Sequence, residues 1–73
     1  MNENINLEID NIFNLAVKNH LENKIDIAQS LYEKVLKINP NHSRALNNLG
    51  ILSFNLNNND KAIECFQKAI DIN

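Results

Sequence analysis

The sequence has little of several residue types on which specialised folds and sites depend. Its 73 residues include one glycine, one proline, one cysteine and no tryptophan. A single cysteine, Cys65, excludes an internal disulfide and favours a reducing compartment, so we predict a cytoplasmic protein. Because glycine-rich stretches are missing, the sequence also has no loop of the kind that cradles phosphate groups.

Positive charge and long apolar runs are also scarce. The formal net charge is -2 at pH 7, whereas a nucleic-acid surface needs a basic face, so we expect no nucleic-acid partner. No apolar run approaches the roughly 20 residues of a membrane-spanning helix, and we expect no membrane partner. No lysine or arginine precedes Lys18, which argues against a secretory signal or a transit peptide.

Catalytic and metal-binding patterns are missing as well. Zinc needs three or four ligands at characteristic spacing, but His20, His42 and Cys65 are isolated from one another. The sequence contains no Ser-His-Asp or Cys-His arrangement that a small helical fold could bring together. We therefore predict no enzyme, no catalytic residues, no metal and no cofactor.

What the chain does have is helical periodicity. Apolar residues recur with helical spacing in four runs separated by short breaks, and no stretch alternates with a period of two for long enough to form a strand. Short breaks favour antiparallel neighbours packed as hairpins. The predicted apolar faces comprise Ile9, Ile12, Phe13, Ala16, Val17 and Leu21; Ile27, Ala28, Leu31, Tyr32, Val35, Leu36 and Ile38; Leu46, Leu49, Ile51, Leu52, Phe54 and Leu56; and Ala62, Ile63, Cys65, Phe66, Ala69, Ile70 and Ile72.

The breaks suggest where the helices begin and end. Asn23 is suited to a left-handed conformation that ends the first helix, and the proline at position 40 closes the second. Asp26, with Gln29 three residues later, predicts a capping box at the start of the second helix. Ser43 is the predicted cap of the third helix, and Asp60 is the predicted start of the fourth.

The sequence repeats itself with a period of 34 residues. At this shift Leu15-Ala16 falls on Leu49-Gly50, Ala28 on Ala62, and Tyr32 on Phe66. Small residues meet small ones and an aromatic meets an aromatic, which indicates an internal repeat.

The repeat offers a reason for the one glycine. Gly50 costs its helix roughly 0.5–1 kcal/mol relative to alanine. Gly50 and Ala16 each lie 12 residues before a second small residue, Ala62 or Ala28. We expect each pair to face each other where the two helices of a hairpin cross, so that the backbones approach closely.

With these residues in place, the chain resembles two tetratricopeptide repeats, at residues 9–42 and 43–73. The period, the Leu-Ala/Gly pair, the later alanine, the Tyr/Phe and the proline at position 40 carry the resemblance. It implies an all-α fold in which two antiparallel helix-turn-helix hairpins, four helices in all, stack as a short right-handed α-solenoid. Residues 1–8 are then either an N-terminal extension or the start of the first helix, and the second repeat stops just before its closing proline.

The resemblance also implies a function. In this family the first helix of each hairpin lines a concave groove that binds a peptide or a partner helix, so we predict a non-catalytic protein-interaction module, part of a larger protein. The carboxylate clamp of some members is not expected, because only Asn48 matches it. Leu21 and Phe54 are expected to serve in packing. The candidate residues of the concave face are Asp10, Phe13, Val17, His20, Arg44, Asn47, Asn48, Ile51 and Asn55.

An alternative function is structural. No helix follows the fourth one in this sequence, so its apolar residues, Ile63 and Ile70 among them, are expected to meet another surface. Either the chain is a fragment of a longer repeat array, or the terminal hairpins stack or exchange between copies to form a homo-oligomer.

Overall fold

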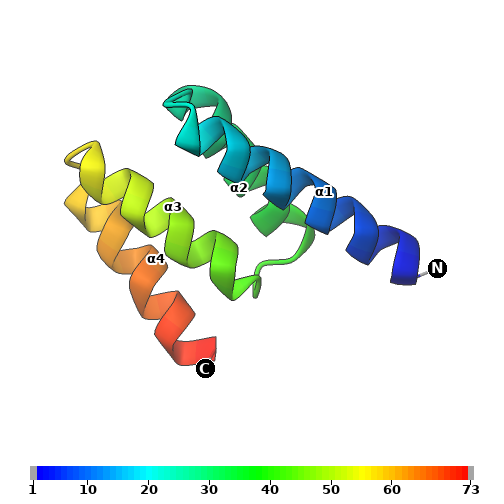
Figure 1. Ribbon diagram of the computed structural model, residues 1–73. Coiled ribbons are helices and arrows are strands. Elements are labelled where there is room, and N and C mark those ends of the chain that lie inside the picture. Colours follow the sequence, from blue (N-terminus) through cyan, green and yellow to red (C-terminus); the bar gives the residue numbers. More distant parts are fainter. Residues whose placement is uncertain (1, 73) are drawn as a thin grey trace.

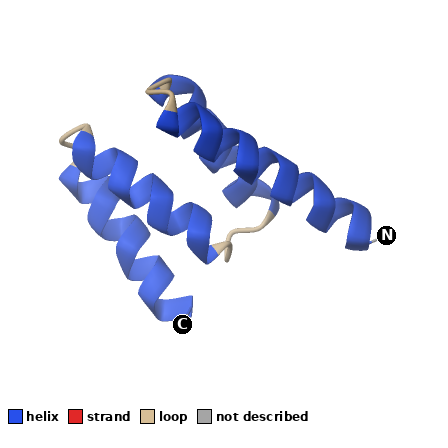
Figure 2. Cartoon of the chain, in the orientation of Figure 1, coloured by secondary structure: helices blue, strands red, loops and turns tan. Residues whose placement is uncertain are grey.

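The chain folds into four helices arranged as two hairpins (Figure 1). A computed structural model describes the backbone of residues 2–72 and the side chains of residues 4–72. Short loops connect the helices (Figure 2), and residues 2–72 contain no strand, which confirms the all-α prediction. Met1, the first residue of the predicted N-terminal extension, and Asn73, the last residue of the predicted second repeat, lie outside the described residues. The helices are α1 (Asn2–Leu21), α2 (Ile25–Ile38), α3 (Ser43–Asn55) and α4 (Asn59–Ile72).

The two hairpins stack side by side. In Figure 1, α1 runs antiparallel to α2 and α3 runs antiparallel to α4, while α3 also packs against α2. The ion pair between Lys61 Nζ and a carboxylate oxygen of Glu33, 2.6 Å long, joins α4 to α2 and lowers the pKa of Glu33. Since α1 begins at Asn2, the described residues before Ile9 form the start of the first helix, and they project beyond α2.

The helix boundaries follow the predicted breaks but use other caps. Asn23 has φ 62° and takes the predicted left-handed conformation after α1. The capping-box prediction is wrong, because α2 already begins at Ile25 and its N-cap residue, Lys24, makes no side-chain hydrogen bond. Asp26 lies instead in the first turn, where its charge is favourable to the helix dipole.

The start of each of the last two helices is shifted by one residue. Ser43 is the first residue of α3 and not its cap; the His42 Nδ1 accepts the hydrogen bond from the Ala45 amide at 3.1 Å. Likewise α4 begins at Asn59, one residue before the predicted Asp60. Side-chain capping depends on the local φ and ψ, which the residue types alone left open between neighbouring positions.

The core lies where α3 covers the first hairpin. One buried cluster joins Phe13 of α1, Tyr32 and Val35 of α2, and Leu49 and Leu52 of α3. Tyr32, Val35 and Leu52 are the largest side chains that are fully buried. The cluster also includes the thiol of Cys65 on α4, where burial raises its pKa.

The backbone of Gly50 lies directly against the ring of Phe66. A Cβ atom added there would lie 2.6 Å from Cε1 of Phe66 and 2.9 Å from its Cδ1. The three atoms nearest to that position all belong to Phe66, so this ring occupies the space that a side chain at position 50 would need. The expected pairing of Gly50 with Ala62 where α3 and α4 cross stays a prediction.

Many apolar residues of the predicted faces lie at the surface. Leu21 is 83% exposed and Phe54 is 61% exposed, so the expectation that they serve in packing is wrong for this chain. Leu21 is the last residue of α1, and Phe54 lies on α3 away from the first hairpin's core cluster. Also exposed are Ile27, Ile38, Ile51, Leu56, Ile63, Ile70 and Ile72.

Candidate binding surface

One side of α3 carries most of the predicted concave-face residues. Arg44, Asn48, Ile51 and Asn55 follow one another at spacings of three or four residues, which places them along one stripe of the helix. Asn47 lies beside this stripe. Arg44, Asn47, Ile51 and Asn55 are exposed, whereas Asn48 is partly buried. These exposed side chains are available to a partner.

The matching stripe on α1 is less accessible. Asp10 is exposed, and Val17 and His20 are partly buried. Phe13, however, is only 6% exposed and belongs to the core cluster. We therefore correct the prediction for Phe13, because the start of α3 folds over its ring.

The ring of Phe13 fixes the start of α3 against α1. The His42 ring lies 5.0 Å from it, centroid to centroid, and the Arg44 guanidinium lies 4.9 Å from its centroid. A cation over an aromatic face is attracted by the ring quadrupole. The contact holds Arg44 near α1, so the cation sits between the two first helices of the hairpins.

Tyr32 of α2 contacts one residue on each of the two helices that form the candidate surface, α1 and α3. Its hydroxyl lies 3.0 Å from the Nδ1 of His20 on α1. Burial raises the pKa of Tyr32, and a hydrogen bond with the Asn48 side chain on α3 acts in the opposite direction. His20 and Asn48 are thus oriented by a buried phenol, and each keeps only part of its surface for a partner.

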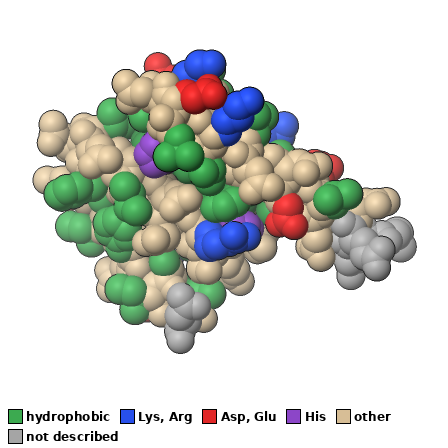
Figure 3. Space-filling model, viewed as in Figure 1, with side chains coloured by type: hydrophobic (Ala, Val, Ile, Leu, Met, Phe, Trp, Pro, Cys, Tyr) green, Lys and Arg blue, Asp and Glu red, His purple; other side chains and the backbone are tan. Residues whose placement is uncertain are grey.

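The two ends of the candidate surface differ in chemistry. Asp10 and Arg44 bring charge to the end where α3 begins, and the charge of Asp10 counteracts the lowering of the pKa of His42. At the other end, His20, Leu52 and Asn55 take part in lining a cavity of about 320 Å³ near the helix loops. In Figure 3, Lys and Arg side chains gather near the α1–α2 loop, whereas hydrophobic side chains gather over α3 and α4.

His42 makes this region sensitive to pH. Burial lowers the pKa of His42, and the nearby Arg44 charge lowers it further. Protonation would put a hydrogen on the Nδ1 that now accepts the Ala45 amide hydrogen, so the cap of α3 would be lost. The folded chain therefore prefers the neutral ring. The contribution of the His42 cap to the free energy of unfolding is fully present above the ordinary histidine pKa of about 6.5 and is lost as the pH falls through the lowered pKa of the folded chain.

We expect the free energy of unfolding to fall by about 1 kcal/mol between pH 7.5 and pH 5, the size of a typical N-cap contribution. Urea unfolding at both pH values measures this change. His42→Asn, which keeps a capping oxygen that does not titrate, is the matched control and should lose less stability over the same range. An equal loss in both proteins would show that the cap of α3 is not the titrating element.

Sequence reasoning missed two of the residues that shape this surface. Neither His42 nor Tyr32 was predicted to take part, yet one caps α3 and the other orients His20 and Asn48. The position of His42 directly before Ser43 was the available signal for a cap. No feature of the sequence indicated the contacts of the Tyr32 hydroxyl, since they depend on how the two hairpins pack together.

The described part of the chain also bears on metal binding and on membrane insertion. Among the side chains that the structure describes, no three His, Cys, Asp or Glu residues lie close enough together to hold a metal ion. Within residues 2–72 no helix combines the length and the apolar character that crossing a membrane requires.

Comparison with known proteins identifies the repeat. Two family models, both described as tetratricopeptide repeat, match residues 10–42 and residues 43–73. No curated protein was found that matches the chain. Repeats of this family are generally protein–protein interaction modules and generally non-catalytic.

Proposed function

Because the chain belongs to the tetratricopeptide repeat family, we propose that it binds a peptide or helix of another protein on the surface formed by α1 and α3. The observation that carries this proposal is the exposed stripe of Arg44, Ile51 and Asn55 beside Asn48 on α3. Arg44 supplies charge, Ile51 supplies an apolar contact, and the two amides can pair with a partner's backbone.

The stripe favours a partner with an apolar side chain between polar groups. Ile51 is 42% exposed in the middle of the stripe, and the partly buried Val17 occupies the equivalent position on α1, 34 residues earlier. Asp10 and Arg44 at one end can pair with charges of either sign. An amphipathic segment laid along α1 and α3 satisfies both requirements.

The proposal is tested by screening a peptide array for ligands and then measuring affinities by fluorescence anisotropy. Ile51→Ala should weaken a confirmed peptide by roughly fivefold or more, since truncation of a central apolar contact costs at least about 1 kcal/mol. Ile27→Ala is the matched control, because Ile27 is also exposed but lies on α2. It should leave the affinity unchanged.

The opposite pattern would refute the proposal. If Ile51→Ala and Arg44→Ala both bound the peptide as tightly as the unaltered chain, the partner would have to contact another face. A loss of affinity in Ile27→Ala would place that face on the α2 side.

A further inference from the structure

The cavity of about 320 Å³ near the helix loops lies at the junction of the two hairpins. One of its sides comes from the end of α1 and the start of α2, and the other comes from the end of α3. In Figure 1 the α1–α2 and α3–α4 loops lie at this same end of the molecule. The cavity is lined by His20, Asn23, Ile25, Leu52, Asn55 and Leu56.

Three of the lining side chains are apolar. Leu52 is 1% exposed and belongs to the core cluster, and Ile25 packs against that cluster. Both are therefore held in place by the close-packed interior, which gives the cavity a fixed shape. Leu56, the C-cap residue of α3, adds a third apolar side chain and is 50% exposed.

The internal repeat shows that this apolar lining is specific to the junction. At the 34-residue shift, the positions equivalent to the three apolar residues are occupied by polar, exposed side chains: Asn59, Lys18 and Glu22. Packing of the hairpins accounts for the two covered residues, Ile25 and Leu52. It does not account for Leu56, whose exposed half is available to a ligand in the cavity.

His20 supplies a polar group in a fixed orientation. Its Nδ1 lies 3.0 Å from the Tyr32 hydroxyl, and the two rings meet edge to face with centroids 5.8 Å apart. The Nε2 of His20 is then the ring nitrogen left for a ligand, and it donates or accepts according to the tautomer. A ligand hydroxyl pairs with either tautomer because it both donates and accepts.

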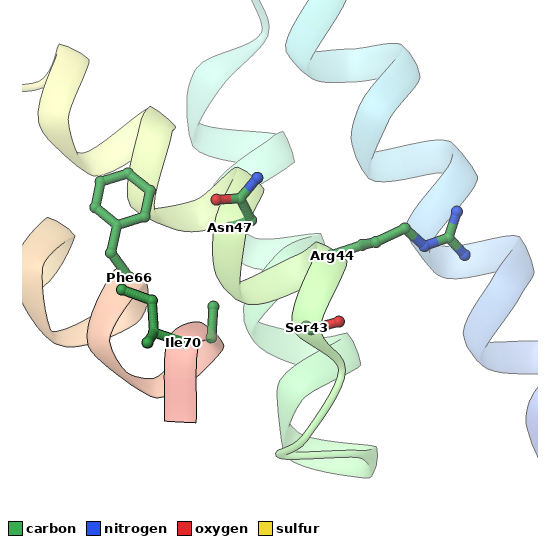
Figure 4. A pocket seen from close by; sticks show the side chains of 6 residues that line it. Ser43, Arg44, Asn47, Phe66 and Ile70 are labelled. Atoms are coloured by element: carbon green, nitrogen blue, oxygen red, sulfur yellow. The ribbon is translucent and has the colours of Figure 1, made fainter. Parts of the chain in front are cut away.

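The cavity is continuous with the proposed binding surface. His20 and Asn55 belong to both, and Asn55 follows Ile51 by about one helical turn, or about 6 Å along α3. The opposite end of the surface is marked by Arg44, which Figure 4 shows extending toward α1 and away from Phe66 and Ile70. A segment that contacts Ile51 therefore reaches the cavity with a neighbouring side chain.

We propose that the cavity takes the side chain of a tyrosine in the partner segment, an assignment that rests on the proposed function. The ring packs between Ile25, Leu52 and Leu56, and its hydroxyl pairs with the Nε2 of His20. A phenylalanine would leave that nitrogen without a partner, and an indole N–H could pair with one tautomer only. The volume lies at the lower end of the range for ligand pockets, about 300–1,000 Å³, which suits a single ring.

Occupancy of the cavity is tested without a peptide. The probe is p-cresol, which is the tyrosine side chain as a free molecule, and the matched control is toluene, the side chain of phenylalanine. Each is titrated into the ¹⁵N-labelled chain and followed by NMR. We expect p-cresol to shift the amides of Ile25 and Leu56 with a Kd on the order of 1 mM, as for other very small ligands. Toluene should bind at least about threefold more weakly, since it cannot pair with His20.

Two variants locate the ring and its hydroxyl. Leu56→Asn should weaken p-cresol at least about threefold, because it removes exposed apolar surface from the cavity. Ile38→Asn is its control, since Ile38 is also exposed but ends α2, about 20 Å from Ile25. His20→Phe should abolish the preference for p-cresol over toluene, whereas a purely structural role of His20 would weaken both ligands alike.

The partner's tyrosine is tested with a peptide confirmed on the array. Replacing its tyrosine by phenylalanine should weaken binding to the unaltered chain at least about threefold and leave binding to the His20→Phe variant unchanged. A double-mutant cycle of this kind measures the contact between the two side chains.

The outcomes that contradict the inference differ from those that contradict the proposed function. Absence of p-cresol shifts at Ile25 and Leu56, or equal effects of Leu56→Asn and Ile38→Asn, would overturn the cavity as a site. Peptide binding that depends on Ile51 but not on a tyrosine would overturn the tyrosine and leave the proposed function intact. Binding of p-cresol in the cavity, with no peptide that depends on Ile51, would overturn the proposed function and the tyrosine with it.

Discussion

Replacing Gly50 by leucine is expected to lower the free energy of unfolding by about 3 kcal/mol, at the upper end of the usual range for overpacking. Even the first added carbon would lie 2.6 Å from Cε1 and 3.0 Å from Cζ of Phe66. A leucine adds three more carbons in the same direction, so the Phe66 ring must leave its position between α3 and α4. Equilibrium urea unfolding followed by circular dichroism at 222 nm measures the change.

Two further variants separate the ring contact from a general intolerance of substitution. Gly50→Ala should change stability by less than about 1 kcal/mol, because the gain in helix propensity offsets a small tilt of the ring. Adding Phe66→Ala to Gly50→Leu should recover part of the loss, since the clash is then removed. If the loss in Gly50→Leu were unchanged by Phe66→Ala, the ring would not be what excludes a side chain at Gly50.

The hairpins themselves were predictable because their signals are local or periodic. The apolar spacing defined four helices, and the 34-residue repeat paired Tyr32 with Phe66 and Ala16 with Gly50 before any contact was known. Asn23 could be placed after α1 because few residues tolerate a positive φ. Such features depend on one residue or on a repeated pattern, so the sequence alone carries them.

The caps and the accessible surface were harder to predict. His42, Ser43 and the Asn58–Asp60 stretch all contain capping side chains, and only the chain direction at each loop decides which of them reaches a free amide. Exposure depends on what covers a helix face. Phe13 and Ile51 both lie on predicted apolar faces, yet Phe13 is 6% exposed and Ile51 is 42% exposed.

The difference between these two residues follows from the order of the hairpins. Phe13 belongs to the first hairpin, and the start of α3 with His42 and Arg44 lies over its ring. Its equivalent in the second hairpin is Asn47, which is exposed and lines a groove beside α4. The same helix position is therefore core in one repeat and surface in the next, and the amino acid changes from apolar to polar accordingly.

Phe13→Ala is expected to lower the free energy of unfolding by about 3–5 kcal/mol, as for other buried phenylalanines. The substitution removes the ring that contacts Tyr32, with centroids 6.1 Å apart, and also the ring beneath His42 and Arg44. A chain of 73 residues without a disulfide has a margin of only a few kcal/mol. The variant should therefore be largely unfolded at 25 °C, seen as a loss of helical circular dichroism in the absence of urea.

Ile51→Ala is the control that distinguishes a core residue from a binding residue. Ile51 is largely exposed on α3, so its truncation should change stability by less than about 0.5 kcal/mol while weakening a peptide ligand. If Phe13→Ala instead remained folded and lost only affinity, Phe13 would belong to the binding surface and the contact of α3 with its ring would be dispensable. Because Phe13→Ala should lose stability and Ile51→Ala should lose affinity while remaining folded, the pair locates the boundary between core and binding surface along one face of the repeat.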